Sequence, residues 1–173
     1  EAIKGNLKKL ISFAQTNGVP LVSSVDCHPE DDPEFEQFPP HCIRGTKGQK
    51  KIDETQTGSE IFVEQAAESF PDPKTHHLVI EKQDFPVFTN PVAEKVFAAI
   101  GATTVYVFGV VTEVCVLAAA LGLLERDYEV KLVTDAIWPI TKENGDKALE
   151  EMKSKGVIFV STEDVLKLSA LAG

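Results

Sequence analysis

Apolar residues recur along the chain first at helical spacing and then in short continuous runs. Segment 3–16 carries apolar residues three and four positions apart and stops at Asn17-Gly18, which predicts a first helix. Five apolar runs predict buried strands, at 20–25, 77–81, 104–109, 129–134 and 157–160. Helical patterns at 91–100, 113–126 and 142–155 separate the later strands, and a short helix is expected from about Thr162.

This alternation predicts an α/β fold. Apolar strands that alternate with helices are typical of a parallel sheet covered on both faces. We therefore expect one domain over residues 1–173, a three-layer Rossmann-like parallel sheet with helices on both faces. A long loop is expected at 29–51, which is rich in Pro, Asp, Glu and Gly. Sites in such sheets gather where strands end, so the chemistry should follow residues 25, 81 and 109.

The charge balance narrows the choice of partners. The 173 residues include 17 basic and 27 acidic side chains, for a net charge of −10. Nucleic acid or an anionic membrane would need a basic face, so we expect neither, and no stretch is long and apolar enough to span a membrane. A small molecule or a second copy of the chain is the expected partner. Three sparse cysteines suit a reducing compartment, and the cytoplasm is the expected location.

Cys115 follows the third predicted strand, where segment 109–115 runs from strand into helix. Thr112 is the predicted N-cap, which places Cys115 in the first helical turn. The helix dipole and the unpaired backbone N–H groups there favour a thiolate and a developing oxyanion. Cys115 is therefore a candidate nucleophile for acyl transfer. The alternative is a small buried apolar residue at the start of a core helix.

Two other strand ends carry polar side chains. Lys82 follows the apolar run 78–80, and a cation there would lower the pKa of a nearby thiol; the alternative is a solvated lysine. Asp26 and His28 end the first strand on one face, and His41 lies between two prolines and a glycine turn. A carboxylate and two imidazoles suit Zn²⁺, Mn²⁺ or Fe²⁺, unless the two histidines are unrelated loop residues.

Taken together, these segments resemble the nicotinamidase branch of the isochorismatase-like cysteine hydrolases. The likeness covers essentially the whole chain in order. Its most specific part is the proline-flanked His41, which is typical of the metal-bearing nicotinamidases. The matching motifs are Asp26-Cys-His28, Phe38-Pro-Pro-His-Cys-Ile-Arg-Gly-Thr-x-Gly48, Lys82, Gly109-Val-Val-Thr-Glu-Val-Cys115-Val and Asp135-Ala136.

The resemblance implies an amidase mechanism. Cys115 would attack a carboxamide carbon and release ammonia through a thioester, which water then hydrolyses. Lys82 would support the thiolate and the transfer of protons. Backbone amides of Val111 and Cys115 would form the oxyanion hole, beside a cis peptide bond between Val110 and Val111.

The resemblance also implies a metal and a substrate pocket. Asp26, His28 and His41 would bind a divalent metal, zinc first and manganese or iron as the alternatives, which meets the pyridine nitrogen of the substrate. Phe38 stands where the family often carries tryptophan, so Phe38 and Val110 are expected to line the pocket.

The chain departs from the family pattern in two places. The family has a triad aspartate at the end of a first, central strand, and nothing here matches that motif. We expect this strand and its aspartate upstream of Glu1, which would make the chain N-terminally incomplete. Asp31 and Asp32 lie where some members carry a further metal-facing histidine. Both are expected in solvent, and the alternative is that either acid approaches the metal directly or through water. The pair His76-His77 leads into a strand and is also expected to be solvated.

The predicted activity is hydrolysis of nicotinamide to nicotinate and ammonia by a metal-dependent cysteine amidohydrolase. A related amidase acting on another small amide, ureide or carbamoyl compound is the first alternative. An inactive metal-binding scaffold is the second, and it draws support only from the absent aspartate. Isochorismatase activity itself would leave His28 and His41 without a role.

Overall fold

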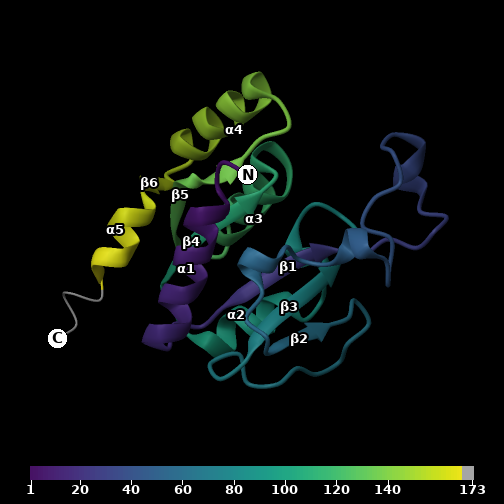
Figure 1. Cartoon of the computed structure of the whole chain (residues 1–173), viewed down its shortest axis with the longest axis horizontal. Helices are drawn as coiled ribbons and strands as arrows, with labels where there is room; N and C mark the ends of the chain where they lie inside the picture. The colour runs from purple at the N-terminus through teal and green to yellow at the C-terminus, as the bar shows by residue number, and fades with distance from the viewer. Residues whose placement is uncertain (169–173) are drawn as a thin grey trace. The chain divides into compact units, whose positions relative to one another are not determined.

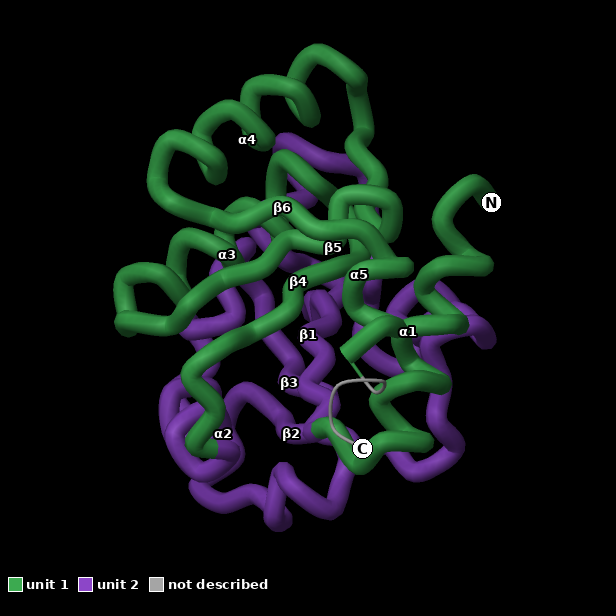
Figure 2. The backbone as a smooth tube through the Cα atoms, turned by 90° about the vertical axis from the view of Figure 1, so that its left-hand side faces the viewer, with its two compact units in different colours: residues 1–19, 101–173 green, residues 20–100 purple. Residues whose placement is uncertain are grey.

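The structure is a computed structural model, and it describes residues 1–168. The chain divides into two compact units, one formed by residues 1–19 and 101–173 and the other by residues 20–100 (Figure 2). Within the described residues, no helix has both the length and the apolar character needed to cross a membrane.

The unit of residues 20–100 contains a parallel sheet of three strands. The strands are β1 (Val22–Asp26), β2 (Glu60–Val63) and β3 (His77–Lys82), in the order β1-β3-β2 (Figure 1). Helix α2 (Ala93–Ile100) follows them. The long segment between β1 and β2 has only three short 3-10 turns, at Pro33–Glu36, Lys47–Gln49 and Asp53–Thr55.

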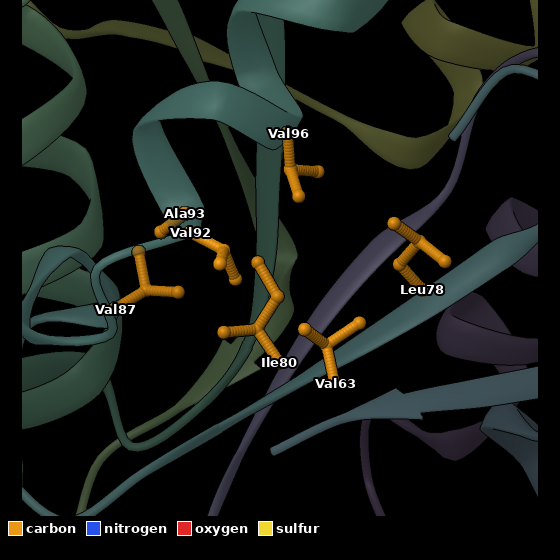
Figure 3. Close-up of a cluster of buried hydrophobic side chains, with 7 residues drawn as sticks. All are labelled: Val63, Leu78, Ile80, Val87, Val92, Ala93 and Val96. Atoms are coloured by element: carbon orange, nitrogen blue, oxygen red, sulfur yellow. The ribbon is translucent and has the colours of Figure 1, made fainter. Parts of the chain in front are cut away.

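The core of this unit lies between β3 and α2. Leu78 and Ile80, two residues apart on one face of β3, pack with a cluster from β2, from α2 and from the segment before α2 (Figure 3). Val79 points to the opposite face and is equally buried. Both faces of the strand are therefore covered, as a near-continuous apolar run requires. The other members of the cluster are Val63, Val87, Val92, Ala93 and Val96.

The other unit contains a second three-stranded parallel sheet, in the order β4-β5-β6. Its strands are β4 (Thr104–Val110), β5 (Glu129–Trp138) and β6 (Ile158–Val160). Its helices are α1 (Lys4–Asn17), α3 (Leu117–Leu124), α4 (Lys142–Ser154) and α5 (Thr162–Leu166).

Helices cover both faces of β5. Val133 packs with side chains of α1 and α5 in one buried cluster. Helix α3 contacts β5 as well. Leu132 and Val133 are both fully buried, and neighbouring strand residues point to opposite faces. Gly18 ends α1 in the left-handed conformation, as the Asn-Gly pair predicts.

The predicted α/β class, the parallel strands and the flanking helices are confirmed. The described strands form two sheets, in which β1 and β4 are edge strands. Two details differ from the prediction. Strand β2 was not predicted, because no helical pattern flanks its short apolar run, and Asp135-Ala136 lie inside β5 rather than after it.

Candidate functional site

Lys82 and Asp26 form an ion pair at the carboxyl ends of neighbouring strands. The two residues lie opposite each other in the register of β1 and β3. Lys82 Nζ donates to Asp26 Oδ1 and, at 3.1 Å, to the backbone carbonyl of Asp84. Because Lys82 is only 2% exposed, the alternative of a solvated lysine is wrong.

Asp26, His28 and His41 lie together just beyond this strand end. One ligand atom from each lies within 4.8 Å of the others. The arrangement depends on backbone pairing, since His28 N–H donates to Cys42 C=O at 3.1 Å and Arg44 N–H donates to His28 C=O at 2.9 Å. These bonds bring the proline-flanked turn beside β1, and the two imidazole centroids are 4.9 Å apart.

The donor atoms of this cluster suit a metal ion. His28 is 1% exposed, and its Nε2 is a buried nitrogen without a hydrogen-bond partner among the described residues. His41 Nδ1 lies 3.0 Å from the carbonyl of Pro39. A buried polar atom without a partner is costly, and a metal ion would satisfy Nε2 of His28. One carboxylate with two imidazoles fits Zn²⁺, Mn²⁺ or Fe²⁺.

Asp32 and Glu34 belong to the same neighbourhood. The sequence indicated Asp32 only as the alternative to a solvated acid, and it did not indicate Glu34. His28, Asp32 and Glu34 also form a group with ligand atoms within 4.8 Å, and Glu34 Oε1 lies 3.8 Å from His41 Nε2. The expectation that Asp32 lies in solvent is wrong, whereas Asp31 is exposed as predicted.

The burial of Asp32 has a local cause. Its Oδ1 accepts the Glu34 N–H at 2.9 Å, which caps the 3-10 turn Pro33–Glu36. This backbone hydrogen bond, followed by the one with His28, lowers the pKa of the Asp32 carboxyl. An aspartate directly before a proline is a helix-start pattern, and it was the available signal.

His77 forms a second polar cluster, at the amino end of β3. The expectation that it is solvated is wrong, because it is buried, whereas His76 is exposed. Its Nε2 lies 2.8 Å from Ser23 Oγ and 3.3 Å from Lys51 Nζ, and its Nδ1 lies 3.0 Å from Thr57 Oγ1. Burial lowers the pKa of His77 to about 4 and that of Lys51 to about 8. In the sequence, the apolar residues that follow His77 gave no indication that the loop carrying Lys51 and Thr57 packs over this histidine.

The predicted nucleophile lies in the other unit, in a turn between β4 and α3. The Val110–Val111 peptide bond is cis, as expected. Residues Thr112–Val116 form a π-helical turn, and Cys115 within it is partly buried. Among the described residues the three cysteines form no disulfide.

Thr112 does not cap the turn, so that prediction is wrong. Val111 occupies the N-cap position, and its carbonyl accepts the N–H groups of Val114 and Val116 at 3.2 and 3.1 Å. Thr112 is buried, and its Oγ1 has no hydrogen-bond partner among the described residues. The wider π-helical turn therefore replaces the side-chain cap that the sequence favoured.

Glu113 fixes this turn to the loop between β5 and α4. Its carboxylate accepts the N–H of Ile140 at 3.0 Å and the N–H of Thr141 at 3.1 Å. Val110 and Trp138, opposite each other in register, end their strands with largely exposed side chains. Glu113 lies inside the motif around Cys115, but its partners are too distant in sequence to be predicted.

The structure thus forms two groups from the predicted residues. Asp26, His28, His41 and Lys82 meet in the unit of residues 20–100, and Phe38 lies partly exposed in the same loop, its N–H donating to Glu34 C=O at 3.0 Å. Val110, Val111 and Cys115 share one turn of the other unit. That the two groups form one active site stays a prediction.

Comparison with known proteins identifies the family. The model of the isochorismatase domain matches residues 1–164. The chain belongs to the isochorismatase domain family. Its α/β fold of parallel sheets flanked by helices agrees with this membership.

Curated relatives match this isochorismatase-family chain at moderate identity. Isochorismatase family protein 2A of Dictyostelium discoideum is 33% identical over 90 residues, which cover 51% of this chain and 45% of that protein. The uncharacterized isochorismatase family protein PncA of Bacillus subtilis is 28% identical over 152 residues, covering 86% of this chain and 76% of that protein. The match with the Dictyostelium protein spans less than half of its length.

Solved structures resemble the chain over most of its length. The pyrazinamidase of Pyrococcus horikoshii, in complex with zinc, gives a TM-score of 0.75 at 28% identity, covering 92% of this chain and 84% of that one. The N-carbamoylsarcosine amidase from Thermoplasma acidophilum gives 0.74 at 25% identity, covering 93% and 83%. Both names denote amidases, and they differ in substrate.

Proposed function

We propose that this protein is a metal-dependent cysteine amidohydrolase that converts nicotinamide to nicotinate and ammonia. The observation that carries the proposal is the cluster of Asp26, His28 and His41 beside the buried Lys82. One carboxylate and two imidazoles can bind a divalent metal. The bound metal would coordinate the pyridine nitrogen of nicotinamide. The pyrazinamidase of Pyrococcus horikoshii, crystallised with zinc, supports zinc as the metal.

The proposed chemistry is nucleophilic catalysis in two steps. Cys115 Sγ attacks the carboxamide carbon and forms the thioester as the C–N bond breaks. The leaving nitrogen takes up the proton that the thiol gave up, and it departs as ammonia. Water then attacks the thioester, which releases nicotinate and restores the thiol, so that amide and water yield acid and ammonia. Backbone N–H groups of Val111 and Cys115 are proposed to stabilise the oxyanion in both steps.

Lys82 is proposed to hold and move the proton in this reaction. Its ammonium group donates to Asp26, so the charge of a deeply buried lysine is balanced within its own unit. Beside a thiol, that ammonium would favour the thiolate. The triad aspartate that the resemblance leads us to expect stays a prediction about residues upstream of Glu1.

The metal would be held by Asp26, His28 and His41, and when bound it would supply a Lewis acid that orients and polarises the substrate. Phe38 and Val110 are proposed to line the pocket for the pyridine ring. A cytoplasmic location and a second copy of the chain as a partner remain parts of this proposal.

The alternative substrates are carbamoyl and ureide compounds, which the same chemistry would hydrolyse. The similarity to N-carbamoylsarcosine amidase favours a carbamoyl or ureide compound as the alternative substrate. Both substrates release ammonia by cleavage of a linear C–N bond. The catalytic residues would be the same, whereas the role of the metal would differ, because only nicotinamide carries a ring nitrogen.

The test compares ammonia release from nicotinamide, pyrazinamide and N-carbamoylsarcosine, using zinc-loaded full-length protein. We expect nicotinamide to have the largest kcat/KM. His41→Ala should lower it at least tenfold, and His76→Ala should leave it unchanged, because His76 is an exposed histidine outside the cluster. If ammonia is released from N-carbamoylsarcosine alone, that compound replaces nicotinamide as the proposed substrate. If none of the three amides releases ammonia, the proposal is overturned.

A further inference from the structure

We propose that Asp32 is a positioning residue, which holds His28 in the tautomer whose Nε2 is open to a metal ion. The inference rests on the metal site of the proposed function and not on its substrate. In this proposal the Asp32 carboxylate contacts His28, a metal-binding side chain, and does not contact the metal itself. It also explains why a loop aspartate is buried beside the cluster.

The hydrogen bond between the two residues selects the tautomer. His28 Nδ1 lies 3.0 Å from Asp32 Oδ2, and both side chains are buried. An ionised carboxylate only accepts hydrogen bonds, so Nδ1 must carry the ring proton. In a neutral imidazole the lone pair then lies on Nε2, which is the nitrogen without a partner among the described residues.

Asp32 is itself held in place by two further donors. The Glu34 N–H donates to Oδ1 at 2.9 Å, and Gln83 Nε2 donates to Oδ2 at 3.2 Å. Gln83 directly follows Lys82, the last residue of β3. The end of this strand therefore positions both Lys82 and, through Gln83, the Asp32 carboxylate that contacts His28. Carboxylates that hold metal-binding histidines in this way commonly change metal affinity when they are removed.

The same contacts make Asp32 a poor ligand, although it lies close enough to His28 and Glu34 to be counted with them. Each of its oxygens already accepts at least one N–H group. Moving Asp32 towards a metal would break the cap of the turn Pro33–Glu36 and leave His28 Nδ1 unpaired in a buried place. Its geometry therefore suits orientation of His28 better than coordination.

Asp32→Asn tests the inference with a side chain of the same size. In one orientation the new amide NH₂ faces the Glu34 N–H, and in the other it faces His28 Nδ1 and favours the wrong tautomer. The matched control is Asp31→Asn, which removes the same charge from the exposed neighbouring residue. We expect Asp32→Asn to raise the Kd for Co²⁺ about 10- to 100-fold, measured from the visible absorption of the bound ion, and Asp31→Asn to leave it unchanged. Equal Kd values for the two variants would overturn the inference.

A second measurement does not depend on the folding of a variant. The ¹⁵N chemical shifts of the His28 ring, followed in the metal-free wild-type protein as the pH is raised until the ring is neutral, should show the remaining proton on Nδ1. A neutral ring with its proton on Nε2 would overturn the inference, as would a wild-type protein that binds no Co²⁺. Absence of ammonia release from nicotinamide, with Co²⁺ binding intact, would instead count against the proposed function alone.

Discussion

Asp26 and Lys82 lie opposite each other at the ends of two parallel strands, and the carboxylate balances the charge of a lysine that is almost fully buried. The register of β1 with β3 places the two residues, so the pair is part of the sheet as well as of the proposed site. Removing one member should therefore affect stability even when no metal is present.

Asp26→Asn should destabilise the protein by about 3 kcal/mol, because it removes the carboxylate charge that pairs with the buried Lys82 ammonium. Urea unfolding in the presence of a chelator measures this free energy without a contribution from metal. The matched control is Glu129→Gln, which breaks the more exposed pair with Lys131 and should cost much less, because solvent screens that pair. Equal losses for the two variants would show that Lys82 does not depend on Asp26.

His77 should make the protein sensitive to acid. Its pKa is about 4 in the folded protein, because burial disfavours the charged ring, and about 6.5 when unfolded. Between these values the unfolded chain binds more protons, so the free energy of unfolding is retained above pH 6.5 and falls as the pH drops towards 4.

His77→Gln should flatten this part of the pH profile, while His76→Gln, which changes an exposed neighbour, should keep the wild-type slope. Urea unfolding at a series of pH values gives both profiles. An unchanged slope in His77→Gln would assign the acid sensitivity to other groups.

Gly145 should not tolerate a side chain. A Cβ at this position of α4 would lie 2.6 Å from Cβ of Pro139, the first residue of the loop that Glu113 holds. We expect Gly145→Ala to destabilise the protein by about 1–3 kcal/mol. Gly5→Ala, at an exposed helical glycine with open space around it, should instead stabilise the protein by up to about 1 kcal/mol. Thermal or urea unfolding that ranks the two variants the other way would contradict this account.

Cys27 should resist alkylation in the folded protein. Burial, followed by the nearby Glu81 carboxylate, raises the pKa of its thiol to about 11. At pH 8 about one Cys27 thiol in a thousand is ionised, and the side chain is also inaccessible. Peptide mapping after brief treatment with iodoacetamide should therefore find Cys115 and Cys42, both partly exposed, modified well before Cys27. Modification of Cys27 at a comparable rate would show that β1 opens easily at its carboxyl end.

The sequence predicted most of the fold because most strands contain short apolar runs, such as 78–80 and 105–108, and the helices between them carry clear stripes. Strand β3 is buried throughout, whereas β4 is only partly buried. Strand β2 escaped prediction although it has the same Ile-Phe-Val run as β6, because polar segments with Gly and Pro flank β2 in place of helical patterns. The full length of β5 escaped it because Asp135 interrupts the apolar run.

The site was predictable where a motif carries the chemistry and not where distant residues meet. Asp26, His28 and His41 could be grouped because the first two end a strand and the third lies in a distinctive turn. The burial of Asp32 and His77 could not be predicted, because it depends on hydrogen bonds to loop residues that no periodicity places. Glu113 binds backbone groups 27 and 28 residues away, which leaves no local signal.

Cys115 is proposed to attack the carboxamide carbon of nicotinamide. This role is tested by the ammonia released from nicotinamide by zinc-loaded wild-type protein, by Cys115→Ala and by the matched control Cys42→Ala. We expect steady release by the wild-type protein and by Cys42→Ala, and none above background by Cys115→Ala. Release by Cys115→Ala at the wild-type rate would rule out Cys115 as the nucleophile, because the amide would then be hydrolysed without its thiol.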